Sequence, residues 1–282
     1  MLILTFMARR FVAGETVDAA VKAVKQLNGA GMSASLDILG ENVKNQEMAI
    51  RTADSYINML QTISDSALNC NISVKLTQMG LDISDDFCFD NVSRILDKAE
   101  SLGIFTRVDM ESSDYTERTL NLVYRWHEKY KKVGAVIQSS LYRSEDDVKE
   151  LNKRGIRVRL CKGAYKEPKS VAYQSKDDVN NSYIKLTDML MEKGDYPAIA
   201  SHDGAMISAA LDAARKYARV KDSYEFQMLY GVNRSAQREL ADQNYNIRIY
   251  TPFGSHWLPY FLRRLRERRE NVIFIAKHLF RD

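Results

Sequence analysis

The sequence predicts an α/β fold, a single-domain (β/α)8 barrel of the TIM type, and three observations support this prediction. Eight short runs with strand-like composition alternate with longer stretches that have helical spacing. The chain has 282 residues, and barrels of about 250 residues commonly stand alone as one domain. It has only four prolines and no stretch with the composition of a linker. Strands that alternate with helices in this way are typical of a parallel sheet with helical crossovers.

An open doubly wound sheet shows the same alternation and is the main alternative. Such a sheet usually opens with a glycine-rich loop that follows the first strand and binds a dinucleotide. Here "GAGM", which begins at Gly29, precedes a predicted strand instead of following one. We therefore interpret it as a turn, and the number of strands favours the closed barrel.

The expected elements cover the whole chain, residues 1–282, as one domain. Residues 1–31 are expected to form an N-terminal helical segment, and residues 32–250 to hold the strands with their intervening helices. Residues 257–282 are expected to form C-terminal helices. The strands are predicted at residues 32–39, 72–76, 105–110, 134–139, 156–161, 197–202, 224–229 and 247–252.

Cap signals mark the ends of two predicted helices. Ser144 and Asp203 each precede a stretch with helical spacing, and both residue types are favoured N-caps. Gly155 follows "EDDVKELNKR", where a glycine is the usual residue after a helix end.

Composition narrows the class of protein. The chain is 45% hydrophobic and 28% charged, which is ordinary for a globular protein in water. Its formal net charge is only +4, so we expect no nucleic-acid partner. Three cysteines without a C-x-x-C pair favour the reducing cytoplasm. No run of about 18 apolar residues is present to span a membrane.

Alternation within the strands predicts a charged barrel interior. In "GIRVRLC", Val158 and Leu160 fall on one face of the strand, whereas Arg157 and Arg159 fall on the other. We expect structural ion pairs low in the barrel, from Asp37, Arg107, Arg157, Glu225 and Arg248. We expect function from the residues near the carboxyl ends of the strands, which are Lys75, Asp109, Gln138, Arg159, His202, Gln227 and Tyr250.

The chemistry of this rim is open on the residues alone. Lys75 could form a Schiff base, pair with a carboxylate or hold a substrate. Asp109 and Glu111 could bind a metal or pair with Lys75 and Arg159; with only four histidines in the chain, ion pairing is favoured and no metal is expected. His202 precedes a helix start, where it could meet a phosphate or carbonyl oxygen or simply be a hydrogen-bonded residue at a strand end.

The C-terminal stretch predicts a helix with an anion-binding face. Four of its residues follow one another at helical spacing and share a face: Tyr260, Arg263, Arg264 and Glu267. Adjacent arginines suit bidentate capture of a carboxylate or phosphate. A solvated basic helix is the alternative, and a nucleic-acid patch is the third and weakest interpretation.

Eight motifs in this order resemble the proline dehydrogenase family, in its monofunctional bacterial form, from about Arg9 to Asn271. The motifs are "SLDILGENV", "SVKLTQMGLDI", "VDMES", "VIQSSLYRS", "RVRLCKGAY", "ASHDG", "EFQMLYGV" and "RIYTPFGSHWLPYFLRRL". The resemblance implies a distorted (β/α)8 barrel with non-covalent FAD. It implies oxidation of L-proline to Δ1-pyrroline-5-carboxylate, the first step of proline catabolism to glutamate, with electrons passed to a membrane quinone. A cytoplasmic protein that contacts the inner face of the membrane peripherally would suit that acceptor.

The resemblance also implies a role for individual residues. It implies that Arg159 lies beside the flavin N5 with Asp109 supporting it, as the catalytic residues. The substrate would be bound by Lys75, Arg263, Arg264, Tyr250, Tyr260 and Leu229, with Glu267 supporting the arginine pair. The cofactor would be bound by Met110, Gln138, Arg159, Lys162, Gly163, Ala164, Ser201, His202 and Gln227. A flavin-free lyase with a Schiff base at Lys75 and a non-catalytic ligand-binding barrel are the rival functions.

Overall fold

Eight parallel strands close into a barrel in this computed structural model, which confirms the predicted fold. The structure describes residue 8 and residues 10–267, with the side chains of residues 263–267 left out. Each strand pairs with its neighbours in chain order, and β1 also pairs with β8. The strands are β1 Ser33–Ile38, β2 Cys70–Val74, β3 Thr106–Val108, β4 Val133–Gln138, β5 Val158–Cys161, β6 Ala198–Ala200, β7 Glu225–Leu229 and β8 Ile247–Phe253.

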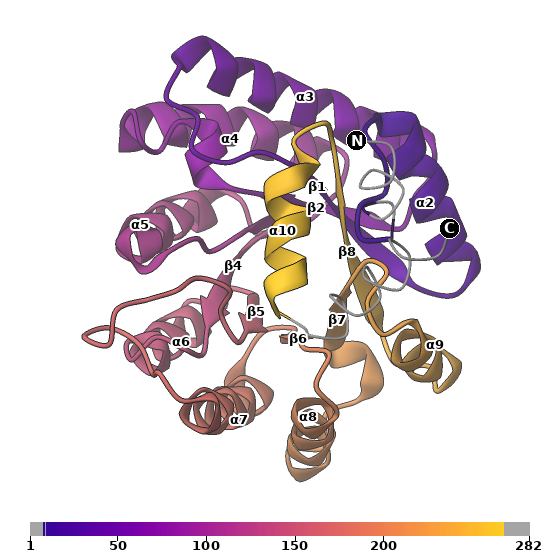
Figure 1. The fold of residues 1–282 in the computed structure, drawn as a ribbon, viewed down its shortest axis with the longest axis vertical. Helices are drawn as coiled ribbons and strands as arrows, with labels where there is room; N and C mark the ends of the chain where they lie inside the picture. Colours follow the sequence, from indigo (N-terminus) through magenta and orange to yellow (C-terminus); the bar gives the residue numbers. More distant parts are fainter. Residues whose placement is uncertain (1–7, 9, 268–282) are drawn as a thin grey trace, which may run out of the picture.

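Helices surround the barrel as Figure 1 shows, and α10 crosses the middle of this view. The helices are α2 Val17–Gly29, α3 Gln46–Asp65, α4 Asp85–Ser101, α5 Ser113–Lys129, α6 Ser144–Lys153, α7 Lys176–Lys193, α8 Gly204–Lys216, α9 Arg234–Asp242 and α10 Trp257–Glu267. Two 3-10 turns, η1 Leu76–Met79 and η2 Lys221–Ser223, precede α4 and β7. Because α10 follows β8, it begins at the carboxyl end of the barrel, where active sites of this fold lie.

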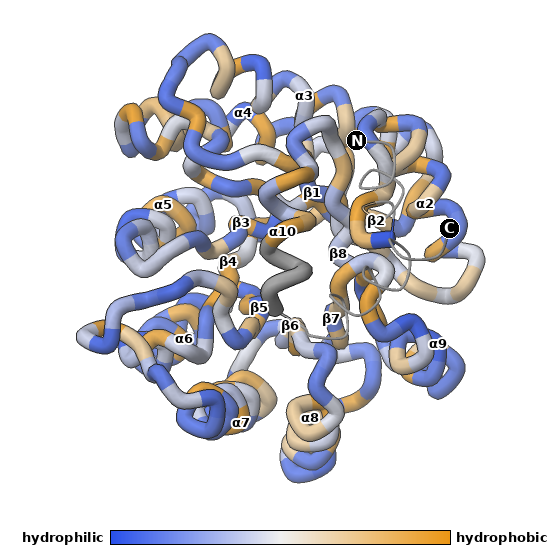
Figure 2. The backbone as a smooth tube through the Cα atoms, in the orientation of Figure 1, coloured by the Kyte–Doolittle hydropathy of each residue, from blue (hydrophilic) through white to orange (hydrophobic). Residues whose placement is uncertain are grey.

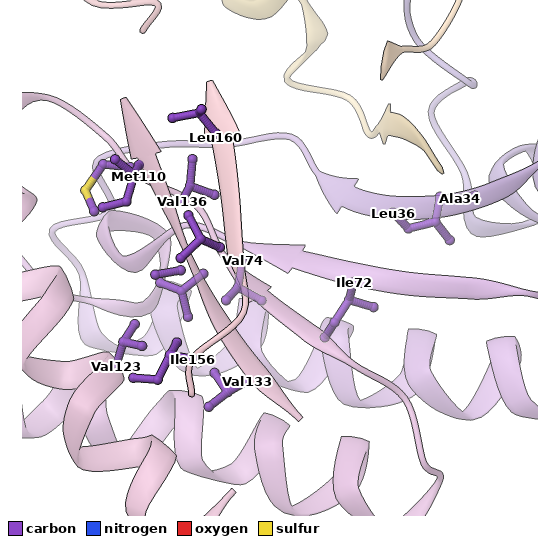
Figure 3. Close-up of a cluster of buried hydrophobic side chains, with 14 of the residues drawn as sticks. Ala34, Leu36, Ile72, Val74, Met110, Val123, Val133, Val136, Ile156 and Leu160 are labelled. Atoms are coloured by element: carbon purple, nitrogen blue, oxygen red, sulfur yellow. The ribbon is translucent and has the colours of Figure 1, made fainter. Parts of the chain in front are cut away.

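The main core lies between the strands and the helix ring. Figure 3 shows Leu36 of β1, Val74 of β2 and Val123 of α5 in this cluster, all fully buried. These strand residues belong to the face that alternation predicted to be apolar. The outer sides of the helices carry most of the hydrophilic positions, as Figure 2 shows for α7 and α8. The barrel interior is therefore left for the polar face of each strand.

A second apolar cluster holds α10 on the barrel. It joins the N-terminal segment, the loops after β1 and β7, and α10, through Ala8, Phe11, Val12, Leu39, Val232, Tyr260 and Phe261. Trp257 Nε1 also donates to Glu15 Oε1 at 3.0 Å. The helix predicted to carry the arginine pair is thereby fixed over the carboxyl end of the barrel. The remainder of the predicted C-terminal helices, residues 268–282, lies outside the described residues.

Two of the three predicted helix boundaries are confirmed and one is wrong. Asp203 is the N-cap of α8 and accepts from the Ala205 amide at 3.1 Å, and Gly155, with φ of +66°, directly follows the C-cap of α6. Ser144 is instead the first residue of α6, after Arg143 at the N-cap. Its hydroxyl donates at 2.5 Å to the Gln138 carbonyl at the end of β4, so it is not free to cap the helix.

Candidate active site at the carboxyl end of the barrel

Arg159 lies at the centre of the polar interior. Strand β5 turns its side chain inward, and only 4% of the residue is exposed. The guanidinium donates to Asp109 Oδ1 at 2.7 Å, and this ion pair is one that the sequence predicted. It also donates to Gln227 Oε1 at 2.5 Å and to Ser73 Oγ at 3.1 Å. Two other strands and the residue directly after β3 therefore fix the direction of this buried cation.

Lys75 lies between two carboxylates. Its Nζ donates to both oxygens of Asp37 at 2.7 and 2.8 Å and lies 3.8 Å from Asp109 Oδ2, which confirms the predicted pairing with Asp109. It also donates to the Tyr250 hydroxyl at 3.1 Å, and that hydroxyl donates to Asp109 Oδ2 at 2.8 Å. Lys75, Asp37, Tyr250, Asp109 and Arg159 thus form one network, which we call the rim network.

The rim network holds Lys75 and Tyr250 in their protonated forms. Burial acts to lower the pKa of Lys75, but the charges of Asp37 and Asp109 outweigh it and raise that pKa above its usual value. Burial raises the pKa of Tyr250 well above 10, and the charges of the same two carboxylates add to the effect. A lysine that forms a Schiff base needs an unprotonated amine, so these charges disfavour that interpretation of Lys75.

Asp37 belongs to this site, and its predicted place low in the barrel is wrong. It lies two residues beyond Ser35, whose hydroxyl meets that of Ser73 at 2.9 Å. Because Ser35 pairs with Asn71 in the sheet, Asp37 lies near the carboxyl end of β1 opposite Ser73, where the Lys75 side chain reaches it. The side chain of Asp37 is fully buried, and burial raises its pKa against the opposing charge of Lys75.

Arg157 is the second correction. The sequence placed it in the barrel interior, but β5 begins only at the next residue, and the Arg157 side chain is 40% exposed. It donates to Asp195 at 3.1 Å at the amino-terminal end of the barrel. Lower in the barrel, Arg248 Nε pairs with Glu225 Oε2 at 3.0 Å as expected, whereas buried Arg107 donates to the Ala135 and Arg157 carbonyls instead of to a carboxylate.

Glu111 turns away from the cations of the rim. Its carboxylate accepts from the Thr77 amide at 3.1 Å and from the Thr77 hydroxyl at 2.6 Å, so its predicted pairing with Lys75 or Arg159 is wrong. Burial raises its pKa in spite of these two bonds. Two hydrogen bonds to the first turn of η1 therefore replace the cation as its partners. The two carboxylates thus have different partners: Arg159 for Asp109 and Thr77 for Glu111.

The residues expected to bind a cofactor lie around the carboxyl ends of β3 to β7. Gln138, at the end of β4, donates to the Glu111 carbonyl at 2.9 Å. Lys162, directly after β5, donates to Asp203 at 2.7 Å and Asn180 at 2.6 Å, and its hydrogen bond lowers the pKa of Asp203. Gly163 has φ of +118°, and a Cβ there would overlap the Ser140 hydroxyl.

The remaining predicted residues divide between the rim and the apolar clusters. Ser201 Oγ accepts from the Asp203 amide at 3.1 Å, and His202 Nε2 accepts from the Leu229 amide at 3.1 Å. Ala164 is exposed beside Gly163, Gln227 supports Arg159, and Met110 is buried in the main core cluster. Tyr260 is buried, and its nearness contributes to the raised pKa of Tyr250. The side chains of Arg263, Arg264 and Glu267 lie outside the described residues, so the arginine clamp stays a prediction.

None of the helices within the described residues is long and apolar enough to cross a bilayer. This agrees with the absence of a long apolar run in the sequence.

Comparisons with known proteins point to one family. The family model described as proline dehydrogenase matches residues 20–277. The chain is 38% identical over 270 residues to proline dehydrogenase 2 of Bacillus subtilis (strain 168), covering 96% of this chain and 89% of that protein. It is 34% identical to proline dehydrogenase of Deinococcus radiodurans, covering 98% of this chain and 90% of that protein.

A solved structure extends the likeness to three dimensions. Proline utilization A (PutA) of Bdellovibrio bacteriovorus, inactivated by N-propargylglycine, superposes with a TM-score of 0.87 at 28% identity. The match covers 93% of this chain but 32% of that one, so the present chain spans about a third of the larger protein. On sequence, motif order and barrel architecture together, this chain belongs to the proline dehydrogenase family.

Proposed function

We propose that this protein is a FAD-dependent enzyme that oxidises L-proline to Δ1-pyrroline-5-carboxylate, the first step of proline catabolism to glutamate. Membership of the proline dehydrogenase family supports proline oxidation. The observation that carries the proposal is the rim network, in which a buried guanidinium and a buried ammonium share Asp109 at the carboxyl end of the barrel.

The rim fits a non-covalently bound flavin in its chemistry. A flavin presents amide-like ring edges and a phosphate-bearing tail, and the predicted cofactor residues offer amide groups at Gln138 and Gln227 and a cation at Lys162. The small residues Gly163 and Ala164 let a flat ligand approach the backbone directly after β5. When bound there, FAD would accept the hydride from proline at N5 and pass the electrons to a quinone.

In this proposal Arg159 supplies the electrostatic part of catalysis. A guanidinium near N5 stabilises the negative charge that develops on the ring system during hydride transfer. Asp109 orients Arg159 through their 2.7 Å contact and accepts from Tyr250 with its other oxygen. Because these groups are held before substrate arrives, little reorganisation accompanies the reaction.

The same proposal gives Lys75 and α10 the task of holding proline. Lys75 stays protonated and attracts the substrate carboxylate, which Arg263 and Arg264 clamp from α10 with Glu267 supporting the pair. The pocket for the ring is formed by Tyr250, Tyr260 and Leu229. Holding the reacting carbon near N5 is the positional contribution to the rate.

Electron transfer to a quinone suggests where the enzyme works. We propose a cytoplasmic protein whose peripheral contact with the inner face of the membrane brings it to the quinone. Flotation with vesicles that contain a quinone, with and without proline, tests this contact; protein that stays with the soluble fraction in both cases contradicts it.

Spectroscopy of the purified protein tests the core of the proposal. We expect protein reconstituted with FAD to be yellow and to be bleached by proline without oxygen. A protein that binds no flavin would favour the lyase, and bound flavin that proline fails to bleach would favour a binding protein. N-propargylglycine offers a second arm: we expect time-dependent loss of activity that excess proline slows.

A further inference from the structure

The long loop after β5, residues 162–175, begins at the rim with Lys162 and is tied to the loop after β4. The Ser140 amide donates to the Lys162 carbonyl at 2.9 Å, and the Tyr173 amide donates to the Ser140 carbonyl at 2.8 Å. Farther along, the Tyr142 amide donates to the Val171 carbonyl at 3.0 Å. These bonds fix the two ends of the loop, and between them residues 163–167 are tied by the side chain of Glu167.

Glu167 fastens this middle part to a different element, the start of α5. The Ser113 amide donates to Glu167 Oε1 at 2.9 Å, and the Ser113 hydroxyl donates to the other carboxylate oxygen. Ser112 is the N-cap of α5, but its own side chain forms no capping bond with any described residue. The carboxylate of Glu167 therefore replaces the usual cap, and its negative charge suits the positive end of the helix dipole.

Glu167 binds the start of α5, and the loop that leads into α5 carries residues of the site. The loop between β3 and α5 begins at Asp109, which pairs with Arg159, and its Glu111 carbonyl accepts from Gln138. The loop that Glu167 belongs to begins at Lys162 and Gly163. The Glu167 carboxylate thus joins the loop that contains Asp109 to the loop that contains Lys162 and Gly163, two of the residues expected to bind the cofactor.

We infer that Glu167 is a positioning residue that holds residues 162–166 in the conformation that receives the cofactor. This inference rests on the proposed function. A loop ordered before binding avoids the entropic cost of ordering it during binding, so loss of the Glu167 contact should weaken cofactor affinity. Glu167 itself need not touch the ligand, because it acts through the backbone on either side of it.

Cofactor titration of variants tests the inference. In Glu167→Ala we expect the Kd for FAD, measured on the apoprotein by quenching of flavin fluorescence, to rise by about fivefold, the size of a lost helix cap. Glu167→Gln keeps one acceptor and should show a smaller rise. The double variant Ser113→Ala with Glu167→Ala should have nearly the same Kd as Glu167→Ala alone, because both substitutions act on the same contact between Glu167 and Ser113. At saturating FAD, the KM for proline should change less than about twofold, because the proline-binding residues lie elsewhere.

Hydrogen exchange on the apoprotein supplies a readout that needs no cofactor. We expect faster exchange in Glu167→Ala for the amides of residues 163–167 as well as for the first turn of α5. Glu47→Ala is the matched control, because Glu47 lies in the first turn of α3 and, among the described residues, pairs only with exposed Arg51.

Three outcomes would overturn the inference. Faster exchange confined to α5 with an unchanged Kd would make Glu167 a cap and nothing more. An unchanged exchange rate at residues 163–167 would show that other contacts hold the loop. A Kd increase of equal size in Glu47→Ala would show a general loss of stability. If the parent protein binds no FAD at all, the proposed function fails, and the exchange data alone still decide whether Glu167 couples the two loops.

Discussion

Arg159 offers the sharpest test, because one substitution separates the ion pair that the structure shows from the electrostatic role that we propose. Arg159→Met removes the cation but keeps much of the side-chain volume. The variant loses the 2.7 Å bond to Asp109 and the bonds to Gln227 and Ser73. Asp109 then remains buried without its main partner.

The cost in stability follows from what Asp109 keeps. Removing one partner of a buried ion pair typically costs about 3–5 kcal/mol. We expect the lower end, about 3 kcal/mol, because Asp109 retains the Tyr250 hydroxyl at 2.8 Å and Lys75 at 3.8 Å. In a domain of this size that loss lowers Tm by about 6–12 °C.

The electrostatic role predicts a second, independent change. A cation near N5 favours the reduced anionic flavin, so Arg159→Met should lower the midpoint potential. Loss of one interaction with a charged group is worth about 1.5–3 kcal/mol, which corresponds to about 30–60 mV for a two-electron couple. Arg159→Lys should recover only part of the shift, because a compact ammonium cannot replace the planar fork.

Tm and flavin potential should be measured on the same preparations. Arg157→Met is the matched control from the other end of the same segment, where the side chain is 40% exposed; it should cost less than about 1 kcal/mol and leave the potential unchanged. A large fall in Tm with an unshifted potential would refute the electrostatic role. An unchanged Tm would refute the conclusion that buried Asp109 needs Arg159 as its partner for stability.

Three further predictions concern the substrate and the rim. Arg264→Met should raise the KM for proline about 10- to 100-fold with flavin still bound; an unchanged KM contradicts the clamp. Tyr250→Ser should reduce the preference for proline over hydroxyproline by about tenfold in kcat/KM, and an unchanged ratio would place Tyr250 outside the pocket. Lys162→Met should lower the unfolding free energy at pH 7 by about 0.5–1 kcal/mol. Because Lys162 lowers the pKa of Asp203, this contribution is present above about pH 4 and is lost as pH falls through the lowered pKa; urea unfolding that shows the same difference at pH 7 and pH 3 contradicts it.

The sequence alone was sufficient to predict the architecture and which face of each strand points into the barrel. Alternation along every strand identified the polar inward face, and it correctly brought Arg159 to Asp109 and Lys75 to the carboxyl end. These predictions succeeded because they depend on local periodicity, which the chain carries in each short segment. The N-cap at Asp203 and the helix stop at Gly155 succeeded for the same reason.

Height within the barrel was decided only by the tertiary structure. Period 2 says which side of a strand a residue faces, but the stagger of neighbouring strands sets its level, and stagger is a property of the closed sheet. Asp37 therefore lies beside Lys75 instead of low in the barrel, and Arg157 lies outside the interior.

Contacts between residues of distant loops could not be predicted from the sequence either. Glu111 meets Thr77, and Glu167 caps α5 across 54 residues of chain, because the loops converge only once the barrel has closed. The sequence determined which residues carry charge on the inner face and at the rim. The closed barrel determined which of those charges meet, because contact between residues far apart in the chain depends on the stagger of all eight strands.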